Sequence, residues 1–306
     1  MIKRVLVVYY SQSGQLTRVL ERMLSPLHEN PAIELSIVRL ESSEDFTFPW
    51  SFWRFFDAFP ESVYLDPPNN LPFELENPHE FDLIIIGYQP WFLSPSLPMS
   101  AFLLSDEAKI ILKDKPVMTV IGCRNMWIEA HKTLKELISK CQGQLIDNVV
   151  FSDQSGPLES FITTPRWMLS GKKDSFLGFS RAGISDDDIV SSERFGKRLV
   201  EKLQDNSHLI NGPMLKNLGA VQVDDRFIAA EKIGKRSFRI WGALIRLFGK
   251  RGSKLRLPIL SFYILFLITL IITVVPINMM IQAMIRRLFK GKIDKIREIL
   301  EAPSGR

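Results

Sequence analysis

The stretch VLVVYYSQSGQLT, residues 5–17, decides the fold. Val5–Tyr10 is an unbroken apolar run with a β-branched bias, which is typical of a strand buried in a parallel sheet. A short loop of small polar residues follows. Apolar residues then recur at helical spacing from Leu16 to Leu27, so a helix begins just after Gly14. The stretch therefore predicts a strand that turns through a small polar loop into a helix.

The same alternation of strand and helix continues along the chain. Further strands are predicted at residues 33–40, 81–88, 116–122 and 144–151, and later helices at 99–112, 127–141 and 186–203. Strands that alternate with helices form a parallel sheet with helices on both faces. The predicted fold class is therefore α/β, with a five-stranded, doubly wound parallel sheet.

Two stretches exceed a minimal version of that plan. Residues 46–64 hold nine aromatic side chains in nineteen positions, and residues 156–183 form a Pro/Gly/Ser-rich connection after the fifth strand. The aromatic stretch is either an apolar lid over a hydrophobic substrate or additional core beneath a long connection. Arg54, Asp57 and Glu61 lie among the aromatics, which favours an exposed apolar surface that meets lipid or substrate.

Composition excludes several classes of protein. The chain has 306 residues, of which 46% are hydrophobic and 24% charged, so it is not a disordered chain. Its two cysteines, Cys123 and Cys141, are too few for a disulfide framework and too far apart for a zinc or CxxC redox motif. These features indicate a reducing, cytosolic compartment.

Charge divides the chain into two parts. Residues 226–306 contain 17 Lys/Arg and 4 Asp/Glu, a net charge of +13, whereas residues 1–225 contain 22 basic and 30 acidic residues, a net charge of −8. The acidic first part argues against a general nucleic-acid binder. We therefore predict a domain at 1–225, which includes the 46–64 insertion and the 156–183 connection, and a basic membrane anchor at 226–306.

A long uncharged run explains the basic second part. Leu257–Ile285 is 29 residues without a charge, longer than the roughly 18 that mark a membrane-segment candidate. The N-terminus lacks the pattern of a secretory signal. Apolar and basic residues interleave between Ile233 and Phe248, as in an amphipathic helix that lies on anionic lipid. We expect the protein at the cytoplasmic face of a membrane, such as a bacterial inner membrane.

The topology of the uncharged run stays open at this level. Basic residues flank both ends, including Lys254 and Arg256 before it and Arg286 and Arg287 after it. The positive-inside rule then prefers both ends in the cytosol, which a re-entrant hairpin broken at Pro276 would satisfy. A single tilted or kinked span is the alternative, because 29 helical residues extend about 43 Å.

Three loops follow strand ends and carry the candidate chemistry. The first loop offers hydroxyls and backbone N–H groups to an anion at the start of a helix, which suits a phosphate. It contains neither a GxGxxG nor a GxxxxGK[ST] motif, which excludes a dinucleotide fingerprint and a nucleoside triphosphatase loop. The phosphate-loop candidates are Ser11, Gln12, Ser13, Gly14, Gln15, Leu16 and Thr17.

The second and third loops add stacking and polar groups at the same sheet edge. In open α/β sheets, ligands bind at the carboxyl ends of the strands, where aromatic side chains can stack on a flat heterocycle. The second-loop candidates are Gln89, Pro90, Trp91 and Phe92, and the third-loop candidates are Cys123, Arg124 and Asn125. A phosphate loop, a stacking loop and a polar loop together predict a flavin mononucleotide (FMN) site.

These motifs carry a family resemblance. VLVVYYSQSGQLT resembles the phosphate loop of the flavodoxin superfamily, and IIIGYQPWFLSPSLPMSAFL and TVIGCRNMW are similar to its second and third flavin loops. The resemblance covers roughly residues 3–152 and implies the strand order 2-1-3-4-5 with FMN as cofactor. One departure is Leu16, followed by Thr17, where flavodoxins usually carry a threonine.

A narrower resemblance concerns the activity. YYSQSGQL, GCRNMW, the chain length and the apolar C-terminal run look like bacterial proteins of the dialkylresorcinol condensing enzyme family. That resemblance implies an FMN-dependent aromatase that converts a cyclohexanedione to a dialkylresorcinol, a hydrophobic substrate that suits a membrane. The alternatives are a membrane quinone reductase, a protoporphyrinogen-type oxidase, a flavodoxin-like electron carrier, and a scaffold without flavin.

Catalytic residues are less evident than the cofactor loops. Arg124 is a candidate to stabilise negative charge on a reduced flavin or an enol, and Tyr88 is the second candidate. Cys123 reads as a small buried residue because no base accompanies it. No metal site is predicted, because the histidines show no ligand spacing: His28, His79, His131 and His208. Partners left open are a second copy of the chain and a pathway enzyme.

Overall fold

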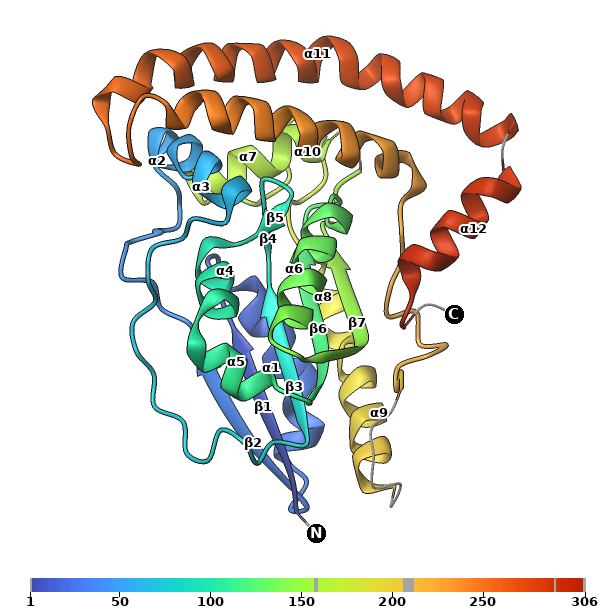
Figure 1. Cartoon of the computed structure of the whole chain (residues 1–306). Helices are drawn as coiled ribbons and strands as arrows, with labels where there is room; N and C mark the ends of the chain where they lie inside the picture. The colour runs from blue at the N-terminus through green and yellow to red at the C-terminus, as the bar shows by residue number, and fades with distance from the viewer. Residues whose placement is uncertain (1, 157–158, 206–211, 289, 305–306) are drawn as a thin grey trace.

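The computed structural model describes residues 2–156, 159–205, 212–288 and 290–304 (Figure 1). Its main sheet contains five parallel strands: β1 (Lys3–Tyr9), β2 (Ile33–Arg39), β3 (Leu83–Tyr88), β6 (Pro116–Cys123) and β7 (Gln144–Ser152). They pair in the order β2-β1-β3-β6-β7. Counted along the main sheet this is 2-1-3-4-5, the flavodoxin-like order, so the predicted fold class is confirmed.

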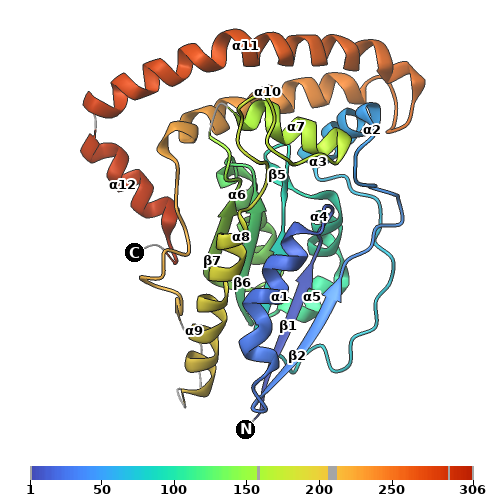
Figure 2. The same ribbon diagram turned by 180° about the vertical axis from the view of Figure 1, so that it is seen from behind.

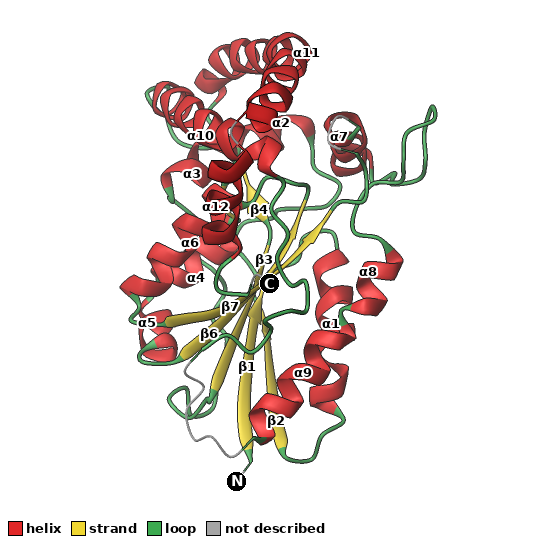
Figure 3. Ribbon diagram, turned by 90° about the vertical axis from the view of Figure 1, so that its right-hand side faces the viewer, coloured by secondary structure: helices red, strands yellow, loops and turns green. Residues whose placement is uncertain are grey.

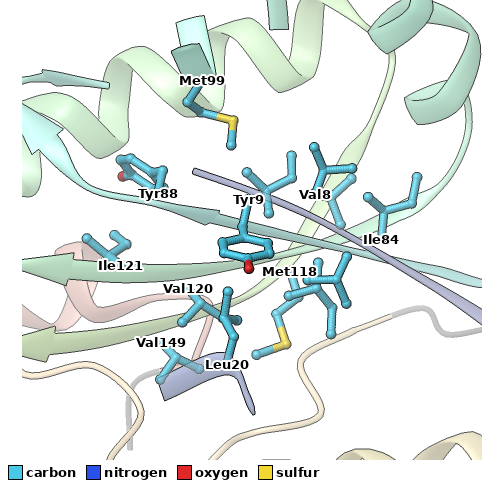
Figure 4. Packing of buried hydrophobic residues seen from close by; sticks show 14 of the residues in the cluster. Val8, Tyr9, Leu20, Ile84, Tyr88, Met99, Met118, Val120, Ile121 and Val149 are labelled. Atoms are coloured by element: carbon cyan, nitrogen blue, oxygen red, sulfur yellow. The ribbon is translucent and has the colours of Figure 1, made fainter. Parts of the chain in front are cut away.

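Helices cover both faces of the sheet, as Figure 3 shows. One face carries α1 (Gln15–His28), α8 (Asp186–Ser191) and α9 (Glu193–Gln204). The other carries α4 (Leu97–Leu104), α5 (Asp106–Leu112) and α6 (Ile128–Lys140). In Figure 4, Met99 and Tyr88 lie on one side of the strands and Leu20 on the other, so the apolar strands have a packed layer on each side.

Close approach of α1 to the sheet depends on a glycine. A Cβ atom at Gly87 in β3 would lie 2.8 Å from the Tyr9 Cβ and 2.9 Å from the Leu20 Cδ1. Only a residue without a side chain fits between the first strand and the first helix there. Gly87, near the end of the third strand, is therefore required by the packing of α1 on the sheet.

Three predicted elements are divided or differently formed. The helix predicted at 99–112 is two helices, because the Ser105 hydroxyl accepts a hydrogen bond from the Ala108 N–H and begins α5 as a new helix. The helix predicted at 186–203 is likewise divided at Ser192 into α8 and α9. The 156–183 connection contains α7 (Ser160–Ser170), and its residues 157–158 lie outside the described residues.

The aromatic stretch 46–64 forms two short helices, α2 (Phe52–Asp57) and α3 (Phe59–Tyr64). Phe46, Trp50 and Phe59 are buried, whereas Phe52 and Trp53 are 43% and 45% exposed. The stretch therefore contributes core residues, as one interpretation predicted, and also presents exposed aromatic side chains, while its role as a lid stays a prediction.

The C-terminal part lies across the carboxyl end of the sheet (Figures 1 and 2). It contains α10 (Asp225–Arg246), a 3-10 turn (Lys254–Arg256), α11 (Leu257–Leu288) and α12 (Lys290–Glu301). Helix α11 continues through Pro276, so the uncharged run is one helix and not a hairpin. The side chains of Arg286 and Arg287 lie outside the described residues.

Candidate functional site

The three predicted loops meet at the carboxyl edge of the sheet. The first loop follows β1, the second follows β3, and the third follows β6. These strands are neighbours in the sheet, with β3 between β1 and β6. Helices α10 and α11 lie above this edge in Figure 1. The site therefore sits between the sheet and the C-terminal helices.

The first loop leaves the beginning of α1 open to an anion. Gly14 is the residue before the helix, with φ of 76°, no side chain caps the helix at this position, and the space beside Gly14 is empty. Among the described residues, the backbone N–H groups of Gln15 and Leu16 have no hydrogen-bond partner. Ser11 orders the loop, since its hydroxyl accepts a hydrogen bond from the Thr17 N–H at 3.3 Å. Free amides at a helix N-terminus suit a phosphate.

Other side chains of the first loop hold neighbouring segments in place. The buried Gln15 amide donates to the Ile184 carbonyl at 3.1 Å and accepts from the Ile184 N–H at 3.2 Å. Gln12 donates to the carbonyl oxygens of Phe46 and Thr47. Leu16 is a core residue that is 2% exposed. Ser13, half-buried beside Gly14, carries the loop hydroxyl without an assigned partner among the described residues.

The second loop is a tight hairpin that the sequence did not predict. Strands β4 (Pro90–Trp91) and β5 (Ser94–Pro95) are joined by Phe92 and Leu93, whose φ angles are 49° and 58°. Two-residue hairpin turns of this kind usually contain Asn or Gly, so two bulky residues in left-handed conformation are strained. The Lys235 ammonium of α10 supports the turn by donating to the Leu93 carbonyl at 2.7 Å and to the Ser94 hydroxyl at 2.6 Å.

Four aromatic rings gather at Trp91. The ring centroids of Phe46 and Trp50 each lie 5.1 Å from that of Trp91, and the Tyr10 centroid lies 5.9 Å from it. Trp91 is 7% exposed, so residues of the 46–64 stretch cover the predicted stacking residue. The indole N–H of Trp50 is buried and has no hydrogen-bond partner among the described residues.

The third loop places one cation near the same edge. The Arg124 guanidinium lies 4.1 Å from the centre of the Phe161 ring and contacts the Met126 sulfur at 3.2 Å. Among the described residues it has no ion-pair partner, and burial lowers its pKa to about 10, against the opposing effect of Asp153. Asn125 donates to the Ser160 hydroxyl of α7 at 3.4 Å.

Two further candidates from the sequence differ in burial. Cys123 is half-buried, and desolvation raises the pKa of its thiol to about 12, which argues against a thiolate nucleophile at neutral pH. Tyr88 is fully buried, and its hydroxyl lies 3.4 Å from the His131 Nδ1. Burial lowers the pKa of His131 to about 3, which keeps this imidazole neutral. His208 lies outside the described residues.

Two charged residues of α10 were missed by the sequence analysis. Glu231 is fully buried, and its Oε2 accepts a hydrogen bond from the Glu129 N–H at 2.8 Å, at the beginning of α6 directly after the third loop. Burial raises the pKa of Glu231 to about 7 and lowers that of Lys235 to about 8. A signal existed: Glu231 is the only acidic residue between Arg226 and Asp294.

Asp153, just past the end of β7, organises the remaining wall. Its carboxylate accepts hydrogen bonds from the N–H groups of Gly183 and Ser155, both at 2.7 Å, and from the Thr164 hydroxyl at 3.3 Å. These contacts fold the 156–183 connection back onto the sheet edge. Together with Gln15 and Ile184, they tie this connection to the first loop.

The arrangement fits FMN at its phosphate end and is aromatic at its ring end. Amides at the start of α1 that have no partner among the described residues would hold the phosphate. Tyr10, Phe46 and Trp50 pack against Trp91 at the same sheet edge, so the flat ring system would lie against the outside of this aromatic cluster. Arg124 would supply positive charge beside it. The donor set matches a monophosphate joined to an aromatic heterocycle.

Comparisons with known proteins agree with this fold class without adding to it. No protein-family model matches the sequence, and a search of curated proteins finds no match. A flavoprotein in complex with FMN from Lactobacillus acidophilus has a similar structure, with 22% identity, a TM-score of 0.39, and coverage of 48% of this chain and 93% of its own.

Two flavodoxin structures are similar over a larger share of this chain. A flavodoxin from the domain Archaea matches with 13% identity and a TM-score of 0.38, and oxidised flavodoxin 1 from Bacillus cereus with 14% identity and a TM-score of 0.35. Each covers 65% of this chain and 98% of its own. At these scores the assignment of a flavodoxin-like fold rests on the strand order described above.

Proposed function

We propose that this flavodoxin-like protein is an FMN-dependent oxidoreductase that acts on a hydrophobic ring substrate at a membrane. The observation that carries the cofactor is the open beginning of α1, where free backbone N–H groups and Gly14 adjoin an aromatic cluster at the same sheet edge. A flavin supplies hydride acceptance when it is bound. The residues of the chain must then bind and orient the substrate and manage its protons.

A chain of aromatic contacts supports a hydrophobic substrate. Ring centroids lie 5.1 Å apart for Phe52 and Phe56, 5.0 Å for Phe56 and Phe55, 5.8 Å for Phe55 and Trp50, and 5.1 Å for Trp50 and Trp91. This chain leads from exposed Phe52 to buried Trp91. Its outer rings, exposed Phe52 and half-buried Phe55 and Phe56, would offer an apolar ring compound a place to bind.

The membrane part of the proposal has separate support. Within residues 254–274, the most apolar 18-residue window has a mean hydropathy of 2.6, and only 17% of that window is buried within the structure. Exposed lysines and arginines accompany this helix, which suits the anionic cytoplasmic face of a bacterial inner membrane. A substrate dissolved in lipid would then enter at α2 and α3.

The specific reaction we propose to test first is aromatisation of an alkylated cyclohexanedione to a dialkylresorcinol. The ring would lose a hydride and a proton: a bound FMN would supply the hydride acceptor, and water or a protein base would take the proton. Arg124 would stabilise the enolate that precedes hydride loss, because a half-buried cation without an ion-pair partner among the described residues favours a neighbouring anion. Tyr88 is too deeply buried to reach such a substrate.

The first experiment is the absorbance spectrum of the purified full chain, with any released cofactor identified by mass. Flavin bands and the mass of FMN would support the proposal. A colourless protein that also fails to bind added FMN would reject the oxidoreductase and favour a scaffold.

Bleaching of the bound flavin then separates the activities. An alkylated cyclohexanedione, a reduced quinone and protoporphyrinogen would each be mixed anaerobically with the oxidised protein. Bleaching by only one class identifies the substrate. Bleaching by none of them, together with electron exchange with redox proteins, would favour an electron carrier.

A further inference from the structure

Both ends of α11 are attached to the same domain. At its beginning, the Arg256 guanidinium is 1% exposed and lies 3.1 Å from the Asp57 carboxylate and 2.6 Å from that of Glu61. Arg256 also donates from Nε to the Gly249 carbonyl at 2.8 Å. This buried ion pair fixes the start of the uncharged helix on α2 and α3.

The far end of α11 returns to the sheet through α12. Arg297 pairs with Asp225 at 3.0 Å, and the Glu301 carboxylate accepts a hydrogen bond from the Val223 N–H at 3.3 Å. The fully buried Ser304 hydroxyl donates to Asp147 of β7 at 2.8 Å and accepts from the Asn148 N–H at 2.6 Å. Residues after the uncharged run therefore belong to the same body as residues before it.

Between these ends, α11 has a buried stripe and an exposed stripe. Leu260, Tyr263 and Ile264 are buried against α3 and α10, and the Tyr263 ring stacks on Phe59 at a centroid distance of 4.6 Å. Among the described residues, most of the exposed side chains of α11 are large and apolar, and they include Phe262, Leu265, Ile268, Ile272, Val274 and Ile277, at 48% to 68% exposure. The hydroxyls of the exposed Ser261, Thr269 and Thr273 donate to backbone carbonyls one turn earlier in the helix. On α10, Ile233 and Ile240 are also exposed, at 63% and 70%.

Basic residues outnumber acidic ones around this apolar face. Exposed lysines and arginines lie on α10, in the turn before α11 and at the start of α12: Lys232, Arg236, Arg239, Lys250, Lys254, Lys290 and Lys292. Residues 226–306 contain 17 Lys/Arg and 4 Asp/Glu, and of the acidic residues Glu231 is fully buried and Asp294 pairs with Arg297. An apolar surface bordered mainly by cations fits the interface of an anionic bilayer.

We infer that α11 lies in the plane of one membrane leaflet and does not cross the bilayer. A span would separate its ends by about 30 Å of hydrocarbon, and the structure holds both ends on one domain. Its 32 residues extend about 48 Å along the domain instead. This inference rests on the proposed membrane association and adds its geometry: α10 and α11 form one docking surface for anionic lipid.

Cysteine labelling tests the geometry on the full chain in membranes. Lys250→Cys and Gly291→Cys place reporters before and after α11 at exposed positions, and the unmodified chain, whose Cys123 and Cys141 are buried or half-buried, gives the background. A membrane-impermeant maleimide is added to spheroplasts and to inverted membrane vesicles of an expressing bacterium. We expect both reporters to react in inverted vesicles and at least tenfold less in spheroplasts.

The outcomes separate the geometry from the association. Labelling of either reporter in spheroplasts would show a span and overturn the inference, while the membrane location stands. Absence of the protein from the membrane fraction, and from floated vesicles that contain anionic lipid, would overturn both. A fluorescent dye attached to Ile272→Cys checks the depth of the helix in the bilayer. Quenching of the dye by lipids brominated near the headgroup supports the in-plane helix, and quenching by lipids brominated at the bilayer centre contradicts it.

Discussion

Glu231 is completely buried, and its carboxyl group accepts a hydrogen bond from the backbone at the beginning of helix α6. Its Oε2 accepts the Glu129 N–H, whereas its Oε1 is buried without a partner among the described residues. Burial raises the pKa to about 7 from an ordinary value of 4.5. The folded state therefore binds a proton that the unfolded chain releases between these values, and its stability falls as the pH rises from about 4.5 to 7.

Replacing this carboxyl by an amide tests that linkage. We expect Glu231→Gln to keep the bond from the Glu129 N–H and to remove the loss of stability above pH 5. Between pH 5 and 8, the free energy of unfolding of the wild type should fall relative to that of the variant by about 3 kcal/mol. Its melting temperature should fall relative to that of the variant over the same range. Comparing the two proteins cancels the opposite effect of His131, whose lowered pKa destabilises the fold as the pH falls below 6.5. Parallel melting curves across this range would contradict a charged, buried Glu231.

Ser13 provides a test of the phosphate loop. A carboxylate at this half-buried position would repel a phosphate at the start of α1, so Ser13→Glu should weaken FMN binding at least tenfold. Ser13→Gln, of similar size and without charge, is the control. Riboflavin lacks the phosphate and should bind both variants equally in a flavin fluorescence titration. Equal loss of riboflavin and FMN would mean that the loop itself is damaged.

At this scale the sequence predicted positions better than partners. It placed Ser11, Gly14 and Trp91 at the sheet edge, because strand ends can be located from apolar runs. It predicted Gln15 as a cofactor residue but could not show that its side-chain amide bonds to Ile184, 169 residues away in the sequence, while its backbone N–H stays free for a phosphate among the described residues. A side-chain amide can bind a ligand or a distant backbone equally well, and only the tertiary structure decides between them.

At the scale of elements, α10 connects two of the three loops. Glu231 contacts the helix that follows the third loop, and one turn later Lys235 holds the strained turn of the second. In the sequence, this helix shows only a basic and apolar pattern, which predicts a lipid surface and not these contacts. The β4–β5 hairpin has no sequence signal, because Phe92-Leu93 lacks the Asn or Gly that marks such turns.

Removing the Lys235 ammonium should loosen the second loop. Lys235→Met keeps the apolar stem and leaves the Leu93 carbonyl and Ser94 hydroxyl without their donor, which we expect to destabilise the protein by about 1–3 kcal/mol. FMN binding should weaken as well, because Trp91 belongs to the same hairpin. Lys232→Met, at an exposed position of the same helix, is the control in urea unfolding and flavin titrations. Equal behaviour of the two variants would contradict a supporting role for Lys235.

At the scale of the whole molecule, the C-terminal helices are built into the domain. The sequence divided the chain near residue 225 by a change in net charge, from −8 to +13. Net charge reports on surroundings and not on contacts, so it could not reveal that Arg256 pairs with Asp57 and Glu61 or that Ser304 reaches β7.

We expect the ion pairs of Arg256 with Asp57 and Glu61 to be essential for attaching the start of α11 to the domain. Arg256→Met leaves two carboxylates without their cation, and we expect a loss of about 3–5 kcal/mol. Adding Asp57→Asn and Glu61→Gln removes the uncompensated charges and should restore much of the stability. Lys254→Met, exposed and two residues away, is the control in thermal melts. A variant as stable as this control would show that the pair contributes nothing.

The contact of Ser304 with Asp147 also affects how the chain could be shortened to remove its apolar helix. Cutting a tail-anchored protein before its apolar segment normally yields an intact soluble domain, but a cut after Arg256 here would also discard Arg297, Glu301 and Ser304. The remaining fragment would keep the sheet but lack the C-terminal peptide whose Ser304 hydrogen-bonds to β7. A synthetic peptide of residues 290–304 should then rebind it and restore its stability, as in fragment complementation.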